Sequence, residues 1–268
     1  MKRTTLLWIL AVIITIPVSY FQRVTGPTYR LAGSVTFDEV EIPYRLERSH
    51  GGEQDAPVRI RTSDPDITGT LEWKRHKTQD PWRKIEMQFS EGELVAYLPH
   101  QPPAGKLEYR IRLSRGENTA LIPHDAPVVI RFKGEIPPQY LYPHILVMII
   151  AFLFSTRAGL EYFSGESLRK EYVLWTVGML FVGGLVLGPV VQFYAFDSLW
   201  TGWPLGTDLT DNKTAVAFIG WLVAALAIRK SRNPRRWVLG AALLAIAVYL
   251  IPHSLFGSEL DYSTLDSP

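Results

Sequence analysis

Five long apolar runs limit what this chain can fold into. They cover Leu6–Tyr20, Leu141–Phe154, Val173–Val191, Ala215–Ile228 and Trp237–Ile251. About 20 apolar residues of α-helix cross the ~30 Å hydrocarbon core of a bilayer, so each run predicts a membrane-spanning helix. The second and fourth runs are short as written. They reach spanning length if their helices continue into flanking polar residues such as Arg157 and Lys213, whose long side chains can extend to the interface.

The segment between the first and second runs has a different character. From Val35 to Lys133 apolar residues alternate with charged ones, and residues 23–135 hold 17 basic and 17 acidic side chains. A face that binds nucleic-acid phosphates needs an excess of Lys and Arg, so this neutral segment argues against a nucleic-acid partner. The chain has no cysteine, which excludes disulfides, thiolate metal sites and thiol catalysis.

The Lys and Arg residues of the short segments predict the direction of the helices. With a cytoplasmic N-terminus, the cytoplasmic segments carry ten of them: Lys2, Arg3, Arg157, Arg169, Lys170, Arg229, Lys230, Arg232, Arg235 and Arg236. The opposite short segments, 192–214 and 252–268, carry only Lys213. We therefore expect an inner-membrane protein with its N-terminus in the cytoplasm and its C-terminus in the periplasm. The first run could instead be a cleaved signal peptide, although no small-x-small cleavage site follows it.

Alternation with a period of two predicts about eight short strands in the periplasmic segment. These are Gly33–Phe37, Val40–Glu47, Val58–Arg61, Thr70–Lys74, Lys84–Phe89, Leu94–Leu98, Leu107–Leu113 and Val128–Phe132. Turn-forming residues separate them, which is typical of an antiparallel β-sandwich. The predicted fold is mixed: a membrane anchor (1–22), a periplasmic sandwich (31–134), a four-helix membrane domain (139–254) and a periplasmic tail (255–268).

Part of this segment resembles a known class of sandwich. The stretch Leu94-Val-Ala-Tyr-Leu-Pro, followed by Pro-Ala-Gly-Lys-Leu-Glu-Tyr-Arg-Ile-Arg-Leu, resembles strands E and F of immunoglobulin and fibronectin type III domains. Tyr109 stands where such folds place a corner or core tyrosine. The resemblance covers roughly residues 31–133 and implies a fold class only. Such domains mostly bind or space other molecules, and the fold by itself does not give a function.

Two histidines are candidates for a metal or haem site. His144 lies near the outer end of the second predicted helix, and His253 near the outer end of the fifth. Neutral imidazoles at similar depth can bind a metal ion or haem iron. The alternative is that both rings belong to the interface, beside Tyr140, Tyr142 and Tyr249. No cofactor follows from the sequence.

The outer loop 192–214 is rich in aromatic and acidic residues. The oxygens of Asp208, Asp211 and Asn212 could bind a hard cation such as Ca²⁺. Alternatively, Asp211 or Thr210 caps the next helix, while Trp200 and Trp203 join the interfacial aromatic belt or wall a ligand site. We expect any such site to include His144, His253 and the sandwich edge Pro99–Gly105. The loop and the Gly-Pro-Val-Val-Gln-Phe-Tyr-Ala-Phe run before it resemble a stretch of bacterial membrane proteins, and that resemblance implies no activity.

Small residues in the third helix predict close helix packing, at Gly184 and Gly188. No Asp, Glu, Lys or Arg lies deep inside an apolar run, which argues against a proton relay. No catalytic or nucleotide-binding motif is found. The leading hypothesis is therefore a non-enzymatic bacterial inner-membrane protein whose periplasmic sandwich binds or positions a protein partner. The alternatives are a redox or metal protein using His144 and His253, and a membrane enzyme or ligand-binding protein centred on the 192–214 loop.

Overall fold

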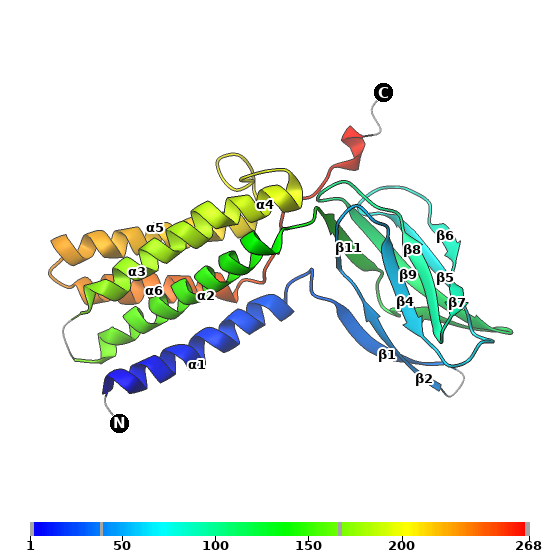
Figure 1. Cartoon of the computed structure of the whole chain (residues 1–268), viewed down its shortest axis with the longest axis horizontal. Coiled ribbons are helices and arrows are strands. Elements are labelled where there is room, and N and C mark those ends of the chain that lie inside the picture. The colour runs from blue at the N-terminus through cyan, green and yellow to red at the C-terminus, as the bar shows by residue number, and fades with distance from the viewer. Residues whose placement is uncertain (1–2, 38–39, 166–167, 266–268) are drawn as a thin grey trace. The chain divides into compact units, whose positions relative to one another are not determined.

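The computed structural model describes residues 3–37, 40–165 and 168–265. It divides into two compact units (Figure 1). A helical unit is formed by residues 1–27 and 136–258, and a β unit by residues 28–135 and 259–268. The last residues of the chain therefore group with the sandwich. Lys2 and residues 266–268, which entered the predictions above, lie outside the described residues.

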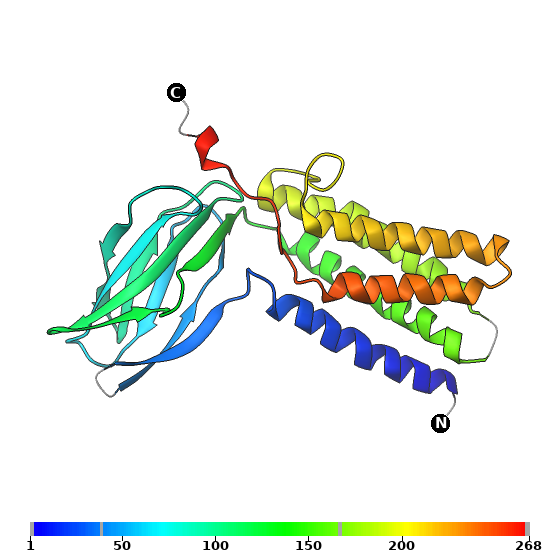
Figure 2. The same cartoon turned by 180° about the vertical axis from the view of Figure 1, so that it is seen from behind.

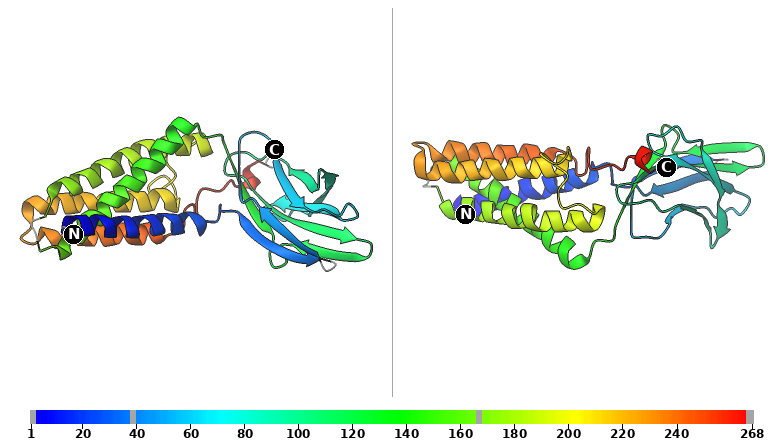
Figure 3. Two further views of the ribbon diagram at one scale, coloured as in Figure 1. Left: turned by 60° about the horizontal axis from the view of Figure 1, so that its bottom comes forward. Right: turned by 90° about the horizontal axis from the view of Figure 1, so that it is seen from above.

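The helical unit is an assembly of long apolar helices that lie side by side (Figure 3). Its helices are α1 (Arg3–Val24), α2 (Pro138–Leu160), α3 (Lys170–Leu180), α4 (Gly188–Phe196), α5 (Leu209–Lys230) and α6 (Pro234–Leu250). A 3-10 turn, η1 (Glu161–Phe163), follows α2, and a π-helical segment, η2 (Phe181–Leu187), joins α3 to α4. Four stretches are long and apolar enough to cross a membrane: Arg3–Val24, Pro138–Phe163, Lys170–Phe196 and Leu209–Lys230. The chain is thus a membrane protein.

The two flanking basic residues behave differently from the prediction that they extend to the interface. Helix α2 continues past Arg157, and α5 includes Lys213, but both side chains are buried, with 1% and 6% of their surface exposed. Arg157 pairs with Glu161 at 2.6 Å. The Lys213 ammonium donates to the main-chain carbonyls of Ile251 and Pro252, at 3.1 and 3.4 Å. Each cation has polar partners inside the helical unit. The sequence of one apolar run does not predict such partners.

Glycines bring the third membrane stretch close to its neighbours. A Cβ added to Gly184 would lie 2.6 Å from Cγ2 of Thr214, and one added to Gly183 would lie 2.9 Å from the sulfur of Met148. Gly188 has more room, with His144 Cε1 3.7 Å away. Gly184 therefore packs against α5 within the same chain, because any larger side chain would push the helices apart.

The β unit contains eleven strands among the described residues. They are β1 (Leu31–Phe37), β2 (Val40–Leu46), β3 (Ser49–Gly51), β4 (Ala56–Arg61), β5 (Thr68–Arg75), β6 (Arg83–Glu86), β7 (Gln88–Ser90), β8 (Glu93–Leu98), β9 (Lys106–Arg115), β10 (Asn118–Ile122) and β11 (Val128–Lys133). One sheet has the order β3-β11-β9-β5-β6, with β10 also paired to β9. The second has the order β4-β8-β7, and β1 and β2 form a hairpin.

The core of the β unit lies between these sheets and includes the inner residues of both. The predicted inward face of β9 is confirmed: Leu107, Tyr109, Ile111 and Leu113 are at most 1% exposed. The hydroxyl of Tyr109 donates to the carbonyl of Glu47 at 2.8 Å. This bond ties the middle of β9 to the link between β2 and β3, so Tyr109 is a core tyrosine with a satisfied hydroxyl.

Two features of the strands differ from the prediction. The predicted strand Lys84–Phe89 is divided: β6 pairs with β5 and β7 pairs with β8, so the chain changes sheets at Met87. The Met87 side chain is buried, and its N–H donates to the Gly69 carbonyl at 2.8 Å. β3 and β10 were not predicted, because β3 has only three residues and the apolar residues of β10, Ala120-Leu-Ile, are consecutive and do not alternate with polar ones.

Candidate functional site

The 192–214 loop is held together by hydrogen bonds to its own acidic and amide side chains. Oδ2 of Asp211 accepts hydrogen bonds from the N–H groups of Thr201 and Gly202, at 2.7 and 3.0 Å. Oδ1 of Asn212 accepts one from the N–H of Trp203 at 2.6 Å. These bonds fix the loop over the first turn of α5. Oxygens that already accept two backbone N–H groups are less available to a cation.

The third predicted ligand, Asp208, caps α5. Its Oδ1 accepts from the Thr210 N–H at 2.8 Å, and its Oδ2 accepts from the N–H and hydroxyl of Ser258, at 2.7 and 2.9 Å. The cap is therefore Asp208 rather than the predicted Thr210 or Asp211. Among the described residues, no group of three or more His, Cys, Asp or Glu side chains is arranged to hold a metal ion.

The predicted aromatic wall is only partly enclosed. Trp200 donates its indole N–H to the Trp203 carbonyl at 3.1 Å, while the Trp203 side chain is 78% exposed. The two histidines, His144 and His253, form hydrogen bonds with different partners. The Nδ1–H of His144 donates to the Gly183 carbonyl at 2.9 Å, and the backbone N–H of exposed His253 donates to the Gln22 carbonyl at 3.0 Å. Within the described ranges, no hydrogen bond or ion pair joins the two rings.

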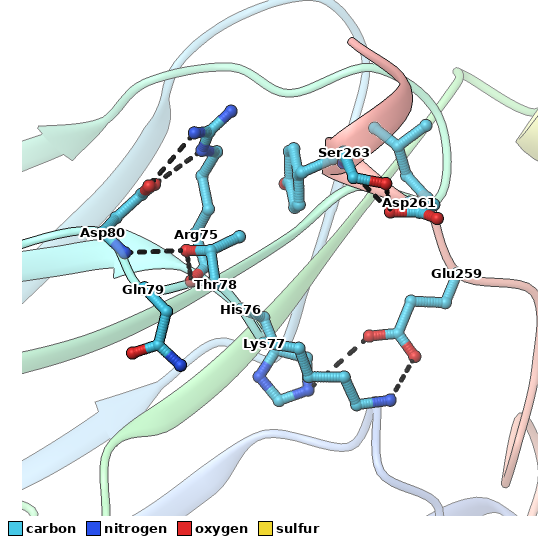
Figure 4. A pocket seen from close by; sticks show the side chains of 11 residues that line it. Arg75, His76, Lys77, Thr78, Gln79, Asp80, Glu259, Asp261 and Ser263 are labelled. Atoms are coloured by element: carbon cyan, nitrogen blue, oxygen red, sulfur yellow. Dashed lines mark hydrogen bonds and ion pairs between the residues drawn. The ribbon is translucent and has the colours of Figure 1, made fainter. Parts of the chain in front are cut away.

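A pocket of about 450 Å³ lies in the β unit (Figure 4). Its walls come from two stretches far apart in sequence, Arg75–Asp80 after β5 and Glu259–Ser263 near the C-terminus. The first wall is held by its own bonds. The Arg75 guanidinium pairs with both oxygens of Asp80 at 2.6 and 3.1 Å, and the Thr78 hydroxyl donates to the Arg75 carbonyl at 3.0 Å. This loop is therefore a preformed surface.

The second wall is the C-terminal segment, drawn in red in Figure 2, which lies against the edge that precedes β9. The Leu260 N–H donates to the Ala104 carbonyl at 3.1 Å. The side chain of Tyr262 is 5% exposed, and the Arg75 guanidinium lies over its ring at 5.2 Å. The tyrosine hydroxyl accepts from the Lys106 N–H at 2.9 Å and lies 3.1 Å from Oε1 of Gln101. We call residues 259–262 the tail segment and the surface that holds it the tail site.

Charge adds to these contacts. The carboxylate of Glu259 lies 2.7 Å from the ammonium of Lys77, 3.3 Å from that of Lys106 and 3.7 Å from Nε2 of His76. Burial acts to raise the pKa of Glu259, but the Lys77 hydrogen bond and the Lys106 charge outweigh it, and the pKa falls below its usual value. Burial raises the pKa of Tyr262 to about 12. At neutral pH Glu259 is thus ionised and Tyr262 keeps its proton.

The sequence prediction named the edge Pro99–Gly105 but missed the segment that binds it. Gln101, Ala104 and Gly105 all meet the tail segment, and a Cβ on Gly105 would lie 3.1 Å from the Tyr262 hydroxyl. The one local signal was a tyrosine that follows two acidic residues, in Glu259-Leu-Asp-Tyr262, in the segment after α6.

A scan against protein-family models and a search of curated protein sequences find no match for this chain. Its function is therefore inferred from its own residues.

Proposed function

We propose that the chain is a non-enzymatic protein of the bacterial inner membrane whose periplasmic sandwich binds a protein partner at the tail site. One observation carries the proposal: the site holds a stretch of polypeptide, whose Tyr262 begins the 3-10 turn η3 (Tyr262–Thr264), by the means that peptide-binding surfaces use. A main-chain hydrogen bond joins Leu260 to Ala104, a near-fully buried tyrosine fills a slot with hydrogen-bonding walls, and a carboxylate lies among three basic side chains. Backbone pairing supplies affinity in such surfaces, and side-chain slots supply specificity.

The distribution of charge supports a periplasmic sandwich, and the parity of the crossings supports placing the tail segment on the same side. The ten-to-one excess of Lys and Arg supports a cytoplasmic N-terminus and a periplasmic sandwich. Because the tail segment is hydrogen-bonded to the sandwich, the chain must cross the membrane an even number of times between them. Three of the spanning stretches lie in that interval. In this proposal α6, whose 17 residues make about 26 Å of helix, supplies the fourth crossing.

The strand order supports an immunoglobulin-like sandwich. Immunoglobulin domains place strands B, E and D in one sheet and strands C, F and G in the other. Here β4-β8-β7 corresponds to B-E-D, and β5-β9-β11 to C-F-G. The tail site then lies at the turns joining E to F and C to its neighbour, at the end of the sandwich opposite the B–C and F–G loops.

A photo-reactive amino acid in place of Gln79 tests this function in intact cells. Gln79 is exposed at the pocket rim, so illumination should join the chain to another protein. Gln88, which is equally exposed but lies on β7 outside the pocket, is the matched control and should give no adduct. Equal adducts from both positions, or none from Gln79, would contradict partner binding at this site.

A further inference from the structure

The tail segment is attached to the β unit only through side-chain and edge contacts. It belongs to no sheet, and its main-chain link to the edge before β9 is the single bond from Leu260 to Ala104 among the described residues. A segment bound in this way resembles a peptide ligand that belongs to the same chain more than it resembles a strand of the sandwich. Its covalent connection to α6 keeps its local concentration high, which favours binding without a large contact area.

The tyrosine slot recognises a specific side chain. The Tyr262 hydroxyl lies between the N–H of Lys106 and the oxygens of Lys106 and Gln101, at 2.9, 3.0 and 3.1 Å. A phenylalanine would leave the Lys106 N–H without its acceptor, whereas the Lys106 carbonyl would keep the His76 N–H at 3.0 Å. The slot therefore selects tyrosine over phenylalanine through the Lys106 N–H. Gly105 permits the close approach, since its missing Cβ would lie 3.1 Å from the hydroxyl.

The acidic end of the segment is recognised by charge. Glu259 is three residues before Tyr262 and faces Lys77, Lys106 and His76. The other basic side chains nearby also contact Glu108: His76 Nδ1 lies 2.9 Å from its carboxylate, and the Lys74 ammonium lies 3.5 Å from it. Lys77 and Lys106 pair with Glu259 instead, so these two ammonium groups are the ones that recognise the carboxylate of a bound peptide.

We infer that the tail site is a recognition site for a peptide of the pattern Glu-x-x-Tyr whose tyrosine begins a 3-10 turn, and that residues 259–262 are its resident, displaceable ligand. This inference rests on the proposed function, because it names the ligand chemistry of that same surface. A partner that presents a glutamate and a tyrosine at this spacing binds when the tail segment leaves. The tail segment therefore controls when the site is open.

The test uses purified protein and a synthetic peptide, so its failure would leave the crosslinking result in cells standing. The chain is ended at Ser258, and a fluorescent peptide of residues 256–265 is added in detergent while its anisotropy is followed. The peptide should bind the shortened chain at least about tenfold more tightly than the full chain, whose site is occupied. Replacing Glu259→Ala or Tyr262→Phe in the peptide should each weaken binding by roughly tenfold, and Leu265→Ala, at an exposed position, should not.

A second measurement uses the full chain and does not depend on the shortened one folding. Because the sequence lacks cysteine, spin labels at Gln79→Cys and Leu265→Cys report the distance between the pocket rim and the segment. A single narrow distance distribution should broaden when excess unlabelled peptide is added, and the Tyr262→Phe peptide should have a smaller effect. A distribution that peptide leaves unchanged, or loss of binding by Leu265→Ala equal to that of Tyr262→Phe, would overturn the inference.

Discussion

Removing either side chain of the Arg157–Glu161 pair should destabilise the helical unit by about 3–5 kcal/mol. The two side chains are 1% and 2% exposed, and their closest atoms lie 2.6 Å apart. The guanidinium also lies 4.8 Å from the ring of Tyr172 and 5.5 Å from that of Trp8, so aromatic rings replace water around it. A single substitution leaves the other charge buried without a partner, which is the costly state.

The double variant separates this explanation from a simple loss of contacts. Arg157→Met together with Glu161→Leu removes both charges and keeps most of the volume, so it should be far more stable than either Arg157→Met or Glu161→Leu alone. Glu171→Gln, an exposed acid on α3, is the control and should change stability by less than about 0.5 kcal/mol. Reversible unfolding in mixed micelles measures all four. Single variants that cost under about 1 kcal/mol would show that water reaches the pair.

Replacing Tyr109 by alanine should destabilise the β unit by about 3–5 kcal/mol, because it empties a large volume in the core and removes a buried hydrogen bond. Tyr109 is 1% exposed, and its hydroxyl is the donor to the Glu47 carbonyl. Tyr109→Phe keeps the ring and should cost about 1–3 kcal/mol for the unpaired carbonyl. Tyr97→Ala, at a 51% exposed tyrosine of β8, should cost under about 0.5 kcal/mol.

Hydrogen exchange of the β9 amides in the full chain measures these costs locally, because the core strands open only with the whole unit. Equal protection in Tyr109→Ala and Tyr97→Ala would contradict the placement of Tyr109 in the core.

The regular elements were predictable because each repeats one physical pattern over many residues. Four of the five apolar runs lie in stretches long and apolar enough to cross a membrane, while the fifth, Trp237–Ile251, forms the shorter helix α6. Alternation predicted the inward face Leu107, Tyr109, Ile111 and Leu113. The change of sheet at Met87 was not predictable, since the alternation continues through it and only pairing with β5 and then β8 reveals it. Arg157 looked like an interfacial residue because its burial depends on Trp8, which is distant in sequence.

The tail site was the least predictable feature. Tyr262 lies 156 residues from Lys106, its hydrogen-bonding partner. A short polar segment after a membrane helix gives no local sign of such a partner. The acidic residues of the 192–214 loop were recognised as unusual, but residue types alone do not specify their partners: Asp211 accepts from backbone N–H groups of the same loop, and Asp208 accepts from Thr210 and Ser258.

The account requires that the sandwich and the C-terminal segment share the periplasmic side, and a topology measurement tests this most directly. A reporter enzyme that is active only in the periplasm is fused after Pro268 or after Arg232, which precedes α6. The account predicts activity after Pro268 and none after Arg232, because α6 makes the last crossing and the basic segment before it stays in the cytoplasm. Activity after Arg232 with none after Pro268 would contradict both the orientation and the binding of the tail segment to a periplasmic sandwich.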